Sequence, residues 1–215
     1  MMFAGAKLSP DELDQDNQYI ILNPSVGTAY FGTGLGTGDL AVAFIPTQIR
    51  ADYPRTMNMS ILGVAGGQGG TGVFVGKNQF GGAITETLGF ATAAGGGTAN
   101  GTKVFSRVDS GTITYVGLGG TAIGSAHVGV KIAGTPAFGI PARLGATTDV
   151  KAATWVDADV AKSLNLSGAG TSAIGGTAQS DVKIDVAGGI VSADSFVITY
   201  RSSHNNTEDG NIFST

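Results

Sequence analysis

The sequence has no cysteine among its 215 residues, and only 13% of its residues are charged. The missing cysteines exclude a disulfide scaffold, thiolate catalysis and a cysteine-ligated metal site. The 12 basic residues are scattered singly, and the formal net charge is −4. Nucleic acids and anionic membranes are bound by clusters of lysine and arginine. We therefore expect no nucleic acid and no membrane as a partner.

Long apolar runs are also missing. No stretch of the sequence approaches the roughly 18 apolar residues that a membrane-spanning helix needs. Residues 1–7 lack the charged region and the apolar region of a secretory signal peptide. From these two features we expect a chain that is made and folded in a reducing cytoplasm.

Glycine is the residue in excess, with 36 copies, and threonine, valine and alanine are also abundant. The glycine share is more than twice the usual one of roughly 7%. Glycine and β-branched residues both lower helix propensity, and glutamate, a good helix former, occurs only three times. The apolar fraction of 42% is ordinary for a chain that folds. This composition predicts an all-β fold.

Short apolar or alternating segments, separated by glycine-rich turns, follow one another along the chain. Such spacing is typical of an antiparallel β-sandwich or a jelly-roll-like barrel. Residues 103–108 and 112–116 are predicted to form a hairpin around a turn at 109–111. The other predicted strands are residues 40–45, which are apolar on both faces and suit a central strand, 57–61, 127–132, 181–186 and 195–200. In residues 181–186 the alternation directs Val182, Ile184 and Val186 toward the core.

The chain divides into an N-terminal arm (residues 1–38), a β-domain (39–201, with a possible subdivision near 145) and a polar C-terminal tail (202–215). The arm has a short strand candidate at 19–22 and too little apolar material to fold alone. Its large apolar side chains are nevertheless costly to leave in water, so we expect the arm to dock on a neighbouring subunit; a flexible linker is the alternative. The proposed docking residues are Phe3, Leu8, Leu13, Tyr19, Ile20, Ile21, Leu22, Tyr30 and Phe31.

None of the sequence motifs that could indicate catalysis or cofactor binding has the flanking residues that such a site needs. Residues 67–72 match G-x-G-x-x-G, but a strand-like segment follows where a dinucleotide site needs a helix, so a mobile loop is the simpler interpretation. The two histidines, His127 and His204, are interpreted as surface residues, and no serine lies in a nucleophile elbow. Trp155 is interpreted as a packing residue, with a sugar-stacking platform as the alternative. We expect no enzyme activity, no cofactor and no metal.

A longer pattern is more informative. Residues 76–87 (GKNQFGGAITET) lead to residues 101–105 (GTKVF), then to 128–130 and 138–144, and later to 194–201. This order resembles a layout of structural proteins of tailed bacteriophages, in which G-x-D-x-F-G-x-x-x-T-E-T leads to G-T-K-x-F, a hairpin and an L-G-L-P-type turn. The resemblance covers roughly residues 40–201. Asn78 stands where that pattern commonly has an acid, and the inserted glycines at 95–97 lengthen one loop.

The resemblance implies a virion component of the capsid decoration or cement type, without catalytic residues. Its implied partners are the major capsid protein and sister copies, as a homo-oligomer on the shell, and its implied place is the capsid surface of a virion made in the bacterial host cytoplasm. A receptor- or glycan-binding module of a phage head or tail fibre is the alternative, and a hydrolase on a β-scaffold is a third hypothesis.

Overall fold

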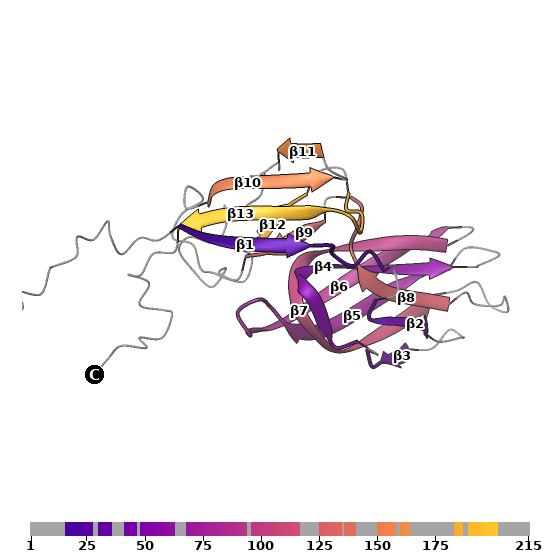
Figure 1. Ribbon diagram of the computed structural model, residues 1–215. Coiled ribbons are helices and arrows are strands. Elements are labelled where there is room, and N and C mark those ends of the chain that lie inside the picture. The colour runs from indigo at the N-terminus through magenta and orange to yellow at the C-terminus, as the bar shows by residue number, and fades with distance from the viewer. Residues whose placement is uncertain are drawn as a thin grey trace, which may run out of the picture.

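The computed structural model describes residues 16–27, 30–35, 41–46, 48–62, 68–93, 96–116, 125–134, 136–140, 150–157, 160–163, 183–186 and 189–201. Every regular element in these ranges is a β-strand. The strands form one sheet of four and one sheet of nine, here called the small sheet and the large sheet, and Figure 1 shows their arrangement. All the strand pairs are antiparallel. The predicted all-β class with antiparallel sheets is therefore confirmed.

The small sheet joins segments from opposite ends of the chain. Its strand order is β1 (Asp16–Leu22), β13 (Ser195–Arg201), β10 (Val150–Asp157) and β11 (Val160–Ser163). The two strands β1 and β13 pair along their whole length, with Asp16 opposite Arg201 and Leu22 opposite Ser195. The predicted strand at 195–200 is confirmed as β13, and the candidate at 19–22 lies within β1.

The large sheet is built mainly from the first two thirds of the chain. Its main path is β12 (Lys183–Asp185), β9 (Ala137–Gly139), β4 (Arg50–Leu62), β7 (Gly96–Val116), β5 (Gln68–Lys77) and β6 (Ala83–Ala93). Beside this path, β8 (Ser125–Val130) pairs with β4, β2 (Gly32–Leu35) pairs with β8, and β3 (Ala41–Phe44) pairs with β7. The chain passes from the large sheet to the small one between β9 and β10, near the subdivision predicted at 145, and β12 returns to the large sheet.

The predicted hairpin at 103–116 is wrong, because β7 is one continuous strand of 21 residues. Ser110 pairs with Val75 and Val108 pairs with Gly76, which leaves Asp109 as the extra residue of a β-bulge. A Cβ atom on Gly111 would lie 2.7 Å from the Val73 carbonyl oxygen. This glycine therefore serves close contact between strands and does not reverse the chain.

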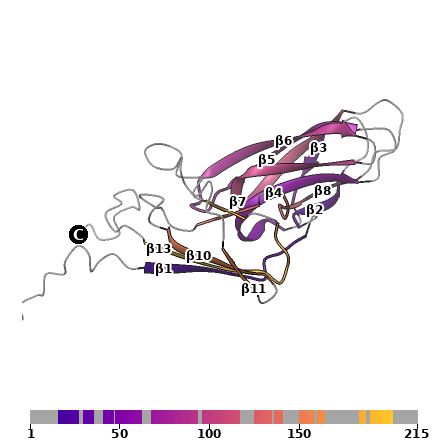
Figure 2. The ribbon, with the colours of Figure 1, turned by 90° about the horizontal axis from the view of Figure 1, so that it is seen from above.

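The long strand β7 connects the two halves of the large sheet. Its residues 96–107 pair with β4, its residues 107–116 pair with β5, and β3 pairs with residues 111–114. Figures 1 and 2 show it curving through the sheet. The prediction of a central strand at 40–45 is also wrong. Among the described strands β3 pairs with β7 alone, and Ile45 beyond its end is 80% exposed.

The buried apolar side chains form two clusters. The first lies within the curved large sheet and includes Phe44, Phe74 and Phe105, each at most 1% exposed. The second lies where the small sheet packs on the β9–β12 end of the large one, and Figure 2 shows the sheets as separate layers. Its members are Ile21, Phe138, Ile140, Val186, Ile190, Phe196 and Ile198. Burial contributes about 1.5–3 kcal/mol for each large apolar side chain.

The predicted inward direction of Val186 is confirmed, because this side chain is fully buried. Met57, Met59 and Ile61 on β4 are buried as their alternation predicts, but the intervening Asn58 and Ser60 are buried as well, because β4 lies between other elements on both faces. Val182 lies outside the described residues, as do the N-terminal residues 1–15 and the C-terminal tail 202–215. The backbone of Ile184 is described within β12, but its side chain is not.

The described strands do not close into a barrel, because β6 pairs only with β5. Side chains bridge the gap between β6 and the first half of β7. The buried Glu86 carboxylate accepts hydrogen bonds from the backbone N–H groups of Thr102 (2.6 Å) and Lys103 (3.0 Å). The Lys103 ammonium in return donates to the Thr85 carbonyl oxygen at 2.8 Å. A Cβ atom on Gly101 would lie 2.5 Å from Glu86 Oε2, so a side chain at this position would displace the carboxylate from where it lies.

We predict that Glu86→Ala weakens the fold, because it leaves the N–H groups of Thr102 and Lys103 without their charged acceptor. Hydrogen bonds to charged groups each contribute about 1.5–3 kcal/mol, so a loss of at least about 2 kcal/mol is expected. Thr87→Ala changes the exposed neighbour and is expected to cost less than about 1 kcal/mol. Urea unfolding of both variants measures the difference, and equal losses would show that the bridge contributes nothing.

Candidate functional site

The residues predicted to form the docking arm fall into two groups. Phe3, Leu8 and Leu13 lie outside the described residues. The other six belong to β1 or to the segment that leads into β2, and β1 is fully paired with β13. The arm boundary at 38 therefore needs correction, because the chain joins the sheets from Asp16 onward.

Alternation along β1 divides the arm residues by exposure, since successive side chains of a strand point to opposite faces. Ile21 is fully buried in the second cluster, and Phe31 is fully buried in the first. Tyr19 and Tyr30 are half-buried and pack against these clusters. Ile20 and Leu22 are 47% and 55% exposed. Of the six described arm residues, these two are the ones free to contact another molecule.

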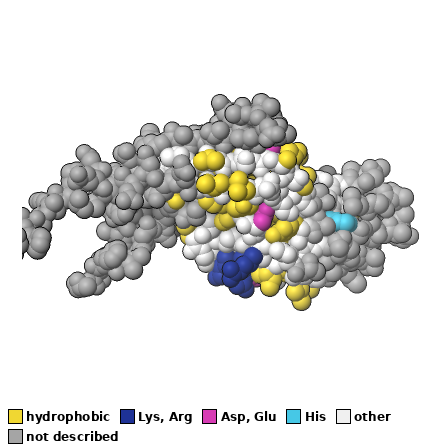
Figure 3. All heavy atoms as spheres, in the orientation of Figure 1, with side chains coloured by type: hydrophobic (Ala, Val, Ile, Leu, Met, Phe, Trp, Pro, Cys, Tyr) yellow, Lys and Arg dark blue, Asp and Glu magenta, His cyan; other side chains and the backbone are white. Residues whose placement is uncertain are grey.

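Ile20 and Leu22 belong to a wider apolar surface on the small sheet. Val197 of β13 is half-buried opposite Ile20, and Val191, in the turn before β13, is 52% exposed. Figure 3 shows hydrophobic side chains gathered on this face of the molecule. We name the four side chains Ile20, Leu22, Val191 and Val197 the β1 surface. It is the candidate functional site, because exposed apolar groups on an ordered strand suit contact with another protein.

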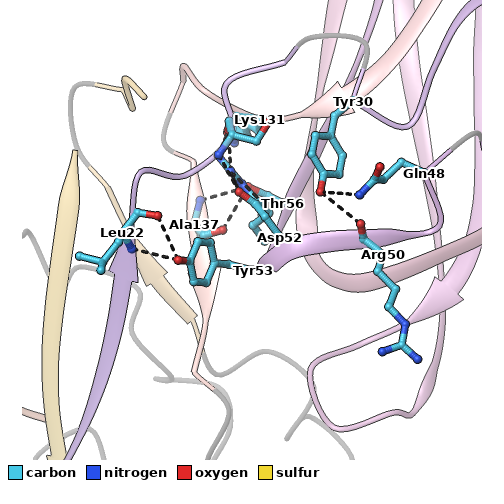
Figure 4. A network of polar contacts seen from close by, with 11 residues as sticks. Leu22, Tyr30, Gln48, Arg50, Asp52, Tyr53, Thr56, Lys131 and Ala137 are labelled. Atoms are coloured by element: carbon cyan, nitrogen blue, oxygen red, sulfur yellow. Dashed lines mark hydrogen bonds and ion pairs between the residues drawn. The ribbon is translucent and has the colours of Figure 1, made fainter. Parts of the chain in front are cut away.

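A polar network holds the end of β1 against β4 (Figure 4). The Tyr53 hydroxyl donates to the Leu22 carbonyl oxygen and accepts from the Leu22 N–H, both at 3.0 Å. The Asp52 carboxylate accepts from the Ser25 N–H at 2.6 Å. These contacts fix the backbone on which Leu22 is presented.

Arg55 is the centre of this network and is only 1% exposed. Its guanidinium donates to the carbonyl oxygens of Ser25 at 2.7 Å and Lys131 at 3.4 Å. It also forms an ion pair with Asp52 at 3.4 Å and lies 4.9 Å from the centre of the Phe138 ring. Burial lowers the pKa of Arg55, and the Asp52 carboxylate acts in the opposite direction. The charge therefore ties together the segment after β1, strand β4 and the segment between β8 and β9.

No protein-family model, curated protein or solved structure matches the chain. Within the described ranges no group of three histidine, cysteine, aspartate or glutamate side chains could hold a metal ion. His127 lies half-buried on β8, whereas His204 lies outside the described residues. The described part of the chain also contains no helix long and apolar enough to cross a membrane.

Two further sequence features have their outcome here. Residues 68–72 of the G-x-G-x-x-G match belong to β5, so the interpretation as a mobile loop is wrong for them. The backbone of Trp155 lies in β10, and its side chain is outside the described part of the structure.

Sequence reasoning missed Asp52, Tyr53 and Arg55. The one signal for them is an acid and a base three residues apart, Asp52 and Arg55, at the start of the run 55–61 that the structure buries.

We predict that Arg55→Met lowers the free energy of unfolding by about 3 kcal/mol, because it leaves Asp52 and two carbonyl oxygens without their buried partner. Arg50→Met is the matched control. Arg50 is exposed, so its substitution is expected to change stability by less than about 0.5 kcal/mol. Urea unfolding followed by circular dichroism compares the two, and a similar stability for both variants would contradict the role given to Arg55.

The Tyr19 hydroxyl is buried and has no hydrogen-bond partner among the described residues. Burial, followed by the neighbouring Tyr53 and Asp52, raises the pKa of Tyr19 above its ordinary value of 10.0. Above pH 10 the unfolded tyrosine loses its proton while the folded one keeps it. The folded state then binds more protons, and its stability falls as the pH rises.

We predict that Tyr19→Phe leaves stability unchanged or higher at pH 7, because it removes an unsatisfied polar group. It also lessens the loss of stability between pH 9 and about pH 11. Tyr53→Phe is the contrasting variant, since it breaks both bonds to Leu22 and costs about 1–2 kcal/mol. Urea unfolding at a series of pH values tests both, and an unchanged alkaline loss in Tyr19→Phe would refute the assignment.

Proposed function

We propose that this chain is a non-enzymatic structural protein of a phage virion, which decorates or cements the capsid shell through its β-domain and its terminal segments. Its partners are the major capsid protein and sister copies, and its place is the capsid surface of a virion made in the bacterial host cytoplasm. The observation that carries the proposal is the pairing of Asp16 with Arg201. Both terminal segments leave the domain at one end of the small sheet, on the strands that carry the β1 surface.

The residues of the bacteriophage resemblance support the proposal through what they do in the fold. Asn78 Oδ1 accepts hydrogen bonds from the N–H groups of Phe80 (3.0 Å) and Gly82 (2.8 Å) and so forms the turn between β5 and β6. An aspartate at this position could accept the same two bonds. The T-E-T and G-T-K segments meet in the bridge from Glu86 to Thr102 and Lys103. The pattern thus describes the framework of a β-domain, consistent with a family that has no catalytic residues.

The finer architecture that we propose is an open sandwich of the jelly-roll-like kind, with an arm formed by residues 1–15. The second apolar cluster between the two sheets supports the sandwich. The bent strand β7, which pairs with both β4 and β5, supports the jelly-roll-like curvature of the large sheet.

Energetics explain why the β1 surface matters more than the arm alone. Burying Phe3, Leu8 and Leu13 would contribute about 1.5–3 kcal/mol each. Ordering a flexible backbone costs about 1–2 kcal/mol per residue, so three side chains would contribute less than the docking of a fifteen-residue arm costs. Ile20 and Leu22 already lie on a paired strand, and their burial needs no further ordering of the backbone. Many copies on one shell would then strengthen a weak contact through avidity.

The experiment measures retention of the protein on shells assembled from the major capsid protein of the same phage. We predict that Ile20→Asp combined with Leu22→Asp weakens retention at least tenfold, because it places two charges in an apolar contact. Deletion of residues 2–15, which leaves β1 intact, is expected to weaken retention further. Thr87→Asp adds a charge at an exposed position of β6, which lies at the opposite end of the large sheet's main path from β9 and β12, and serves as the control.

Two outcomes would overturn the proposal. One is undiminished retention of both altered proteins, provided that their circular dichroism matches that of the unaltered chain. The other is a low copy number. A decoration protein approaches the number of capsid subunits in a particle, whereas the alternative, a receptor- or glycan-binding fibre module, is present in far fewer copies. Quantitative mass spectrometry of purified virions distinguishes the two.

A further inference from the structure

The fold brings three basic side chains into one row, although the sequence scatters them singly. Lys77 of β5 lies opposite Arg107 of β7, and Arg107 lies opposite Arg50 of β4. Directly opposite residues of neighbouring strands point to the same face of a sheet. Arg50 and Arg107 are exposed, and Lys77 is half-buried. We name these three residues the cationic row, and Figure 3 shows lysine and arginine side chains gathered in one patch on that view of the molecule.

The spacing of the cationic row follows from the sheet. Neighbouring strands lie about 4.8 Å apart, so the backbones of Arg50 and Lys77 lie roughly 10 Å from each other, with Arg107 between them. Like charges directly opposite each other destabilise a pair of strands, and here two such pairs follow one another. A local conflict of this kind is typical of a functional site. The cost to the fold indicates that the row has a use beyond folding.

One carboxylate counters the row. Asp109, the extra residue of the β7 bulge, forms an ion pair with Arg107, in keeping with the way a bulge redirects a side chain. The acid nearest in sequence to Arg50 is Asp52, which is engaged in the buried network described above. Within the described part of the chain, Arg50 and Lys77 form no ion pair. Three positive charges and one negative charge leave the row with two positive charges in excess.

The row stands on a backbone that is held in place. The Arg50 carbonyl oxygen accepts a hydrogen bond from the Tyr30 hydroxyl at 3.3 Å, and the Gln48 side-chain amide donates to the same hydroxyl at 3.1 Å. The Lys77 carbonyl oxygen accepts from the Ser106 hydroxyl at 3.2 Å. Figure 4 shows the Arg50 side chain pointing away from the rest of its network. A ligand of the row would therefore order side chains alone, which lowers the entropic cost of binding.

We propose that the cationic row binds an acidic segment of a partner protein, with at least two carboxylates facing the sheet. Guanidinium groups bind carboxylates through paired hydrogen bonds, and the lysine adds a third point charge. Alternate side chains of an extended segment lie about 6.8 Å apart on one face, within reach of the long side chains of Arg50 and Lys77. A nucleic acid is the poorer fit, because the chain as a whole has a net charge of −4 and repels an extended polyanion.

The inference deepens the proposed function and rests on it for its setting, in which the shell protein supplies the acidic segment. Exposed ion pairs add little affinity in water, and charges at the edge of a contact act mainly on the rate of association and on orientation. The cationic row therefore directs how the protein approaches its partner, whereas burial of the β1 surface retains it there.

The test uses the purified full chain and fluorescently labelled hexaglutamate, so it needs no shells. At about 20 mM salt the Debye length is roughly 20 Å. Fluorescence anisotropy is expected to show saturable binding there, and binding at least tenfold weaker at about 300 mM salt. Arg50→Gln combined with Lys77→Gln, the row variant, is expected to bind at least tenfold more weakly at the lower salt concentration.

The matched control is Thr98→Asp combined with Asn100→Asp. It lowers the net charge by the same two units at exposed positions of β7, at least seven residues before Arg107. We expect it to weaken binding less than threefold, because its charges lie away from the row. Equal losses in the row variant and the control would overturn the inference, since net charge alone would then explain them. Undiminished binding by the row variant would overturn it as well.

Two further measurements complete the test. A labelled oligothymidylate of similar charge serves as the nucleic-acid probe, and tighter binding of this probe than of hexaglutamate would contradict the choice of partner. Urea unfolding is expected to show the row variant at least as stable as the unaltered chain; a less stable variant would give the row a structural role and refute the inference. Failure of hexaglutamate to bind refutes this inference alone, because retention on shells tests the proposed function separately.

Discussion

A positive charge enclosed between two sheets is the constraint on which the rest of this structure depends. Arg55 is held by Asp52, by two carbonyl oxygens and by the face of Phe138. Such a charge is costly unless each of its partners stays in place. The segment after β1, strand β4 and the segment between β8 and β9 therefore cannot shift independently. Burial of the second apolar cluster stabilises the packing of the two sheets, whereas the contacts of Arg55 fix how the packed segments align.

A second constraint acts at the opposite side of the large sheet. There the sheet curves until β6 comes close to the first half of β7 without forming backbone hydrogen bonds to it. Glu86 and Lys103 replace those missing bonds, each reaching across to the main chain of the other strand. An open edge strand invites pairing with other chains. The bridge keeps part of this edge occupied and leaves association to the faces of the sheets.

The sequence predicted the class of the fold and the elements whose alternation is regular, such as the buried methionines of β4 and the strand β13. Prediction from the sequence failed where one residue type is compatible with two different local structures. Gly111 follows Asp109 and Ser110 as in a turn, yet it accommodates the Val73 carbonyl oxygen within an unbroken strand. The β1 segment was assigned to an arm because its partner, β13, lies almost 180 residues later, and local patterns do not report such distant pairing. Arg55 was missed for the same reason, since its contacts come from three separate segments.

The pairing of Asp16 with Arg201 also determines how the chain could be re-engineered. Opposite residues of antiparallel strands lie about 5 Å apart, so a short linker could join the two ends of the domain. New ends could then be opened at the exposed turn around Gly134. Peptides fused ahead of β1 and behind β13 would likewise emerge side by side. The two attachment points would behave as one, and cargo placed on either would occupy the same region of space.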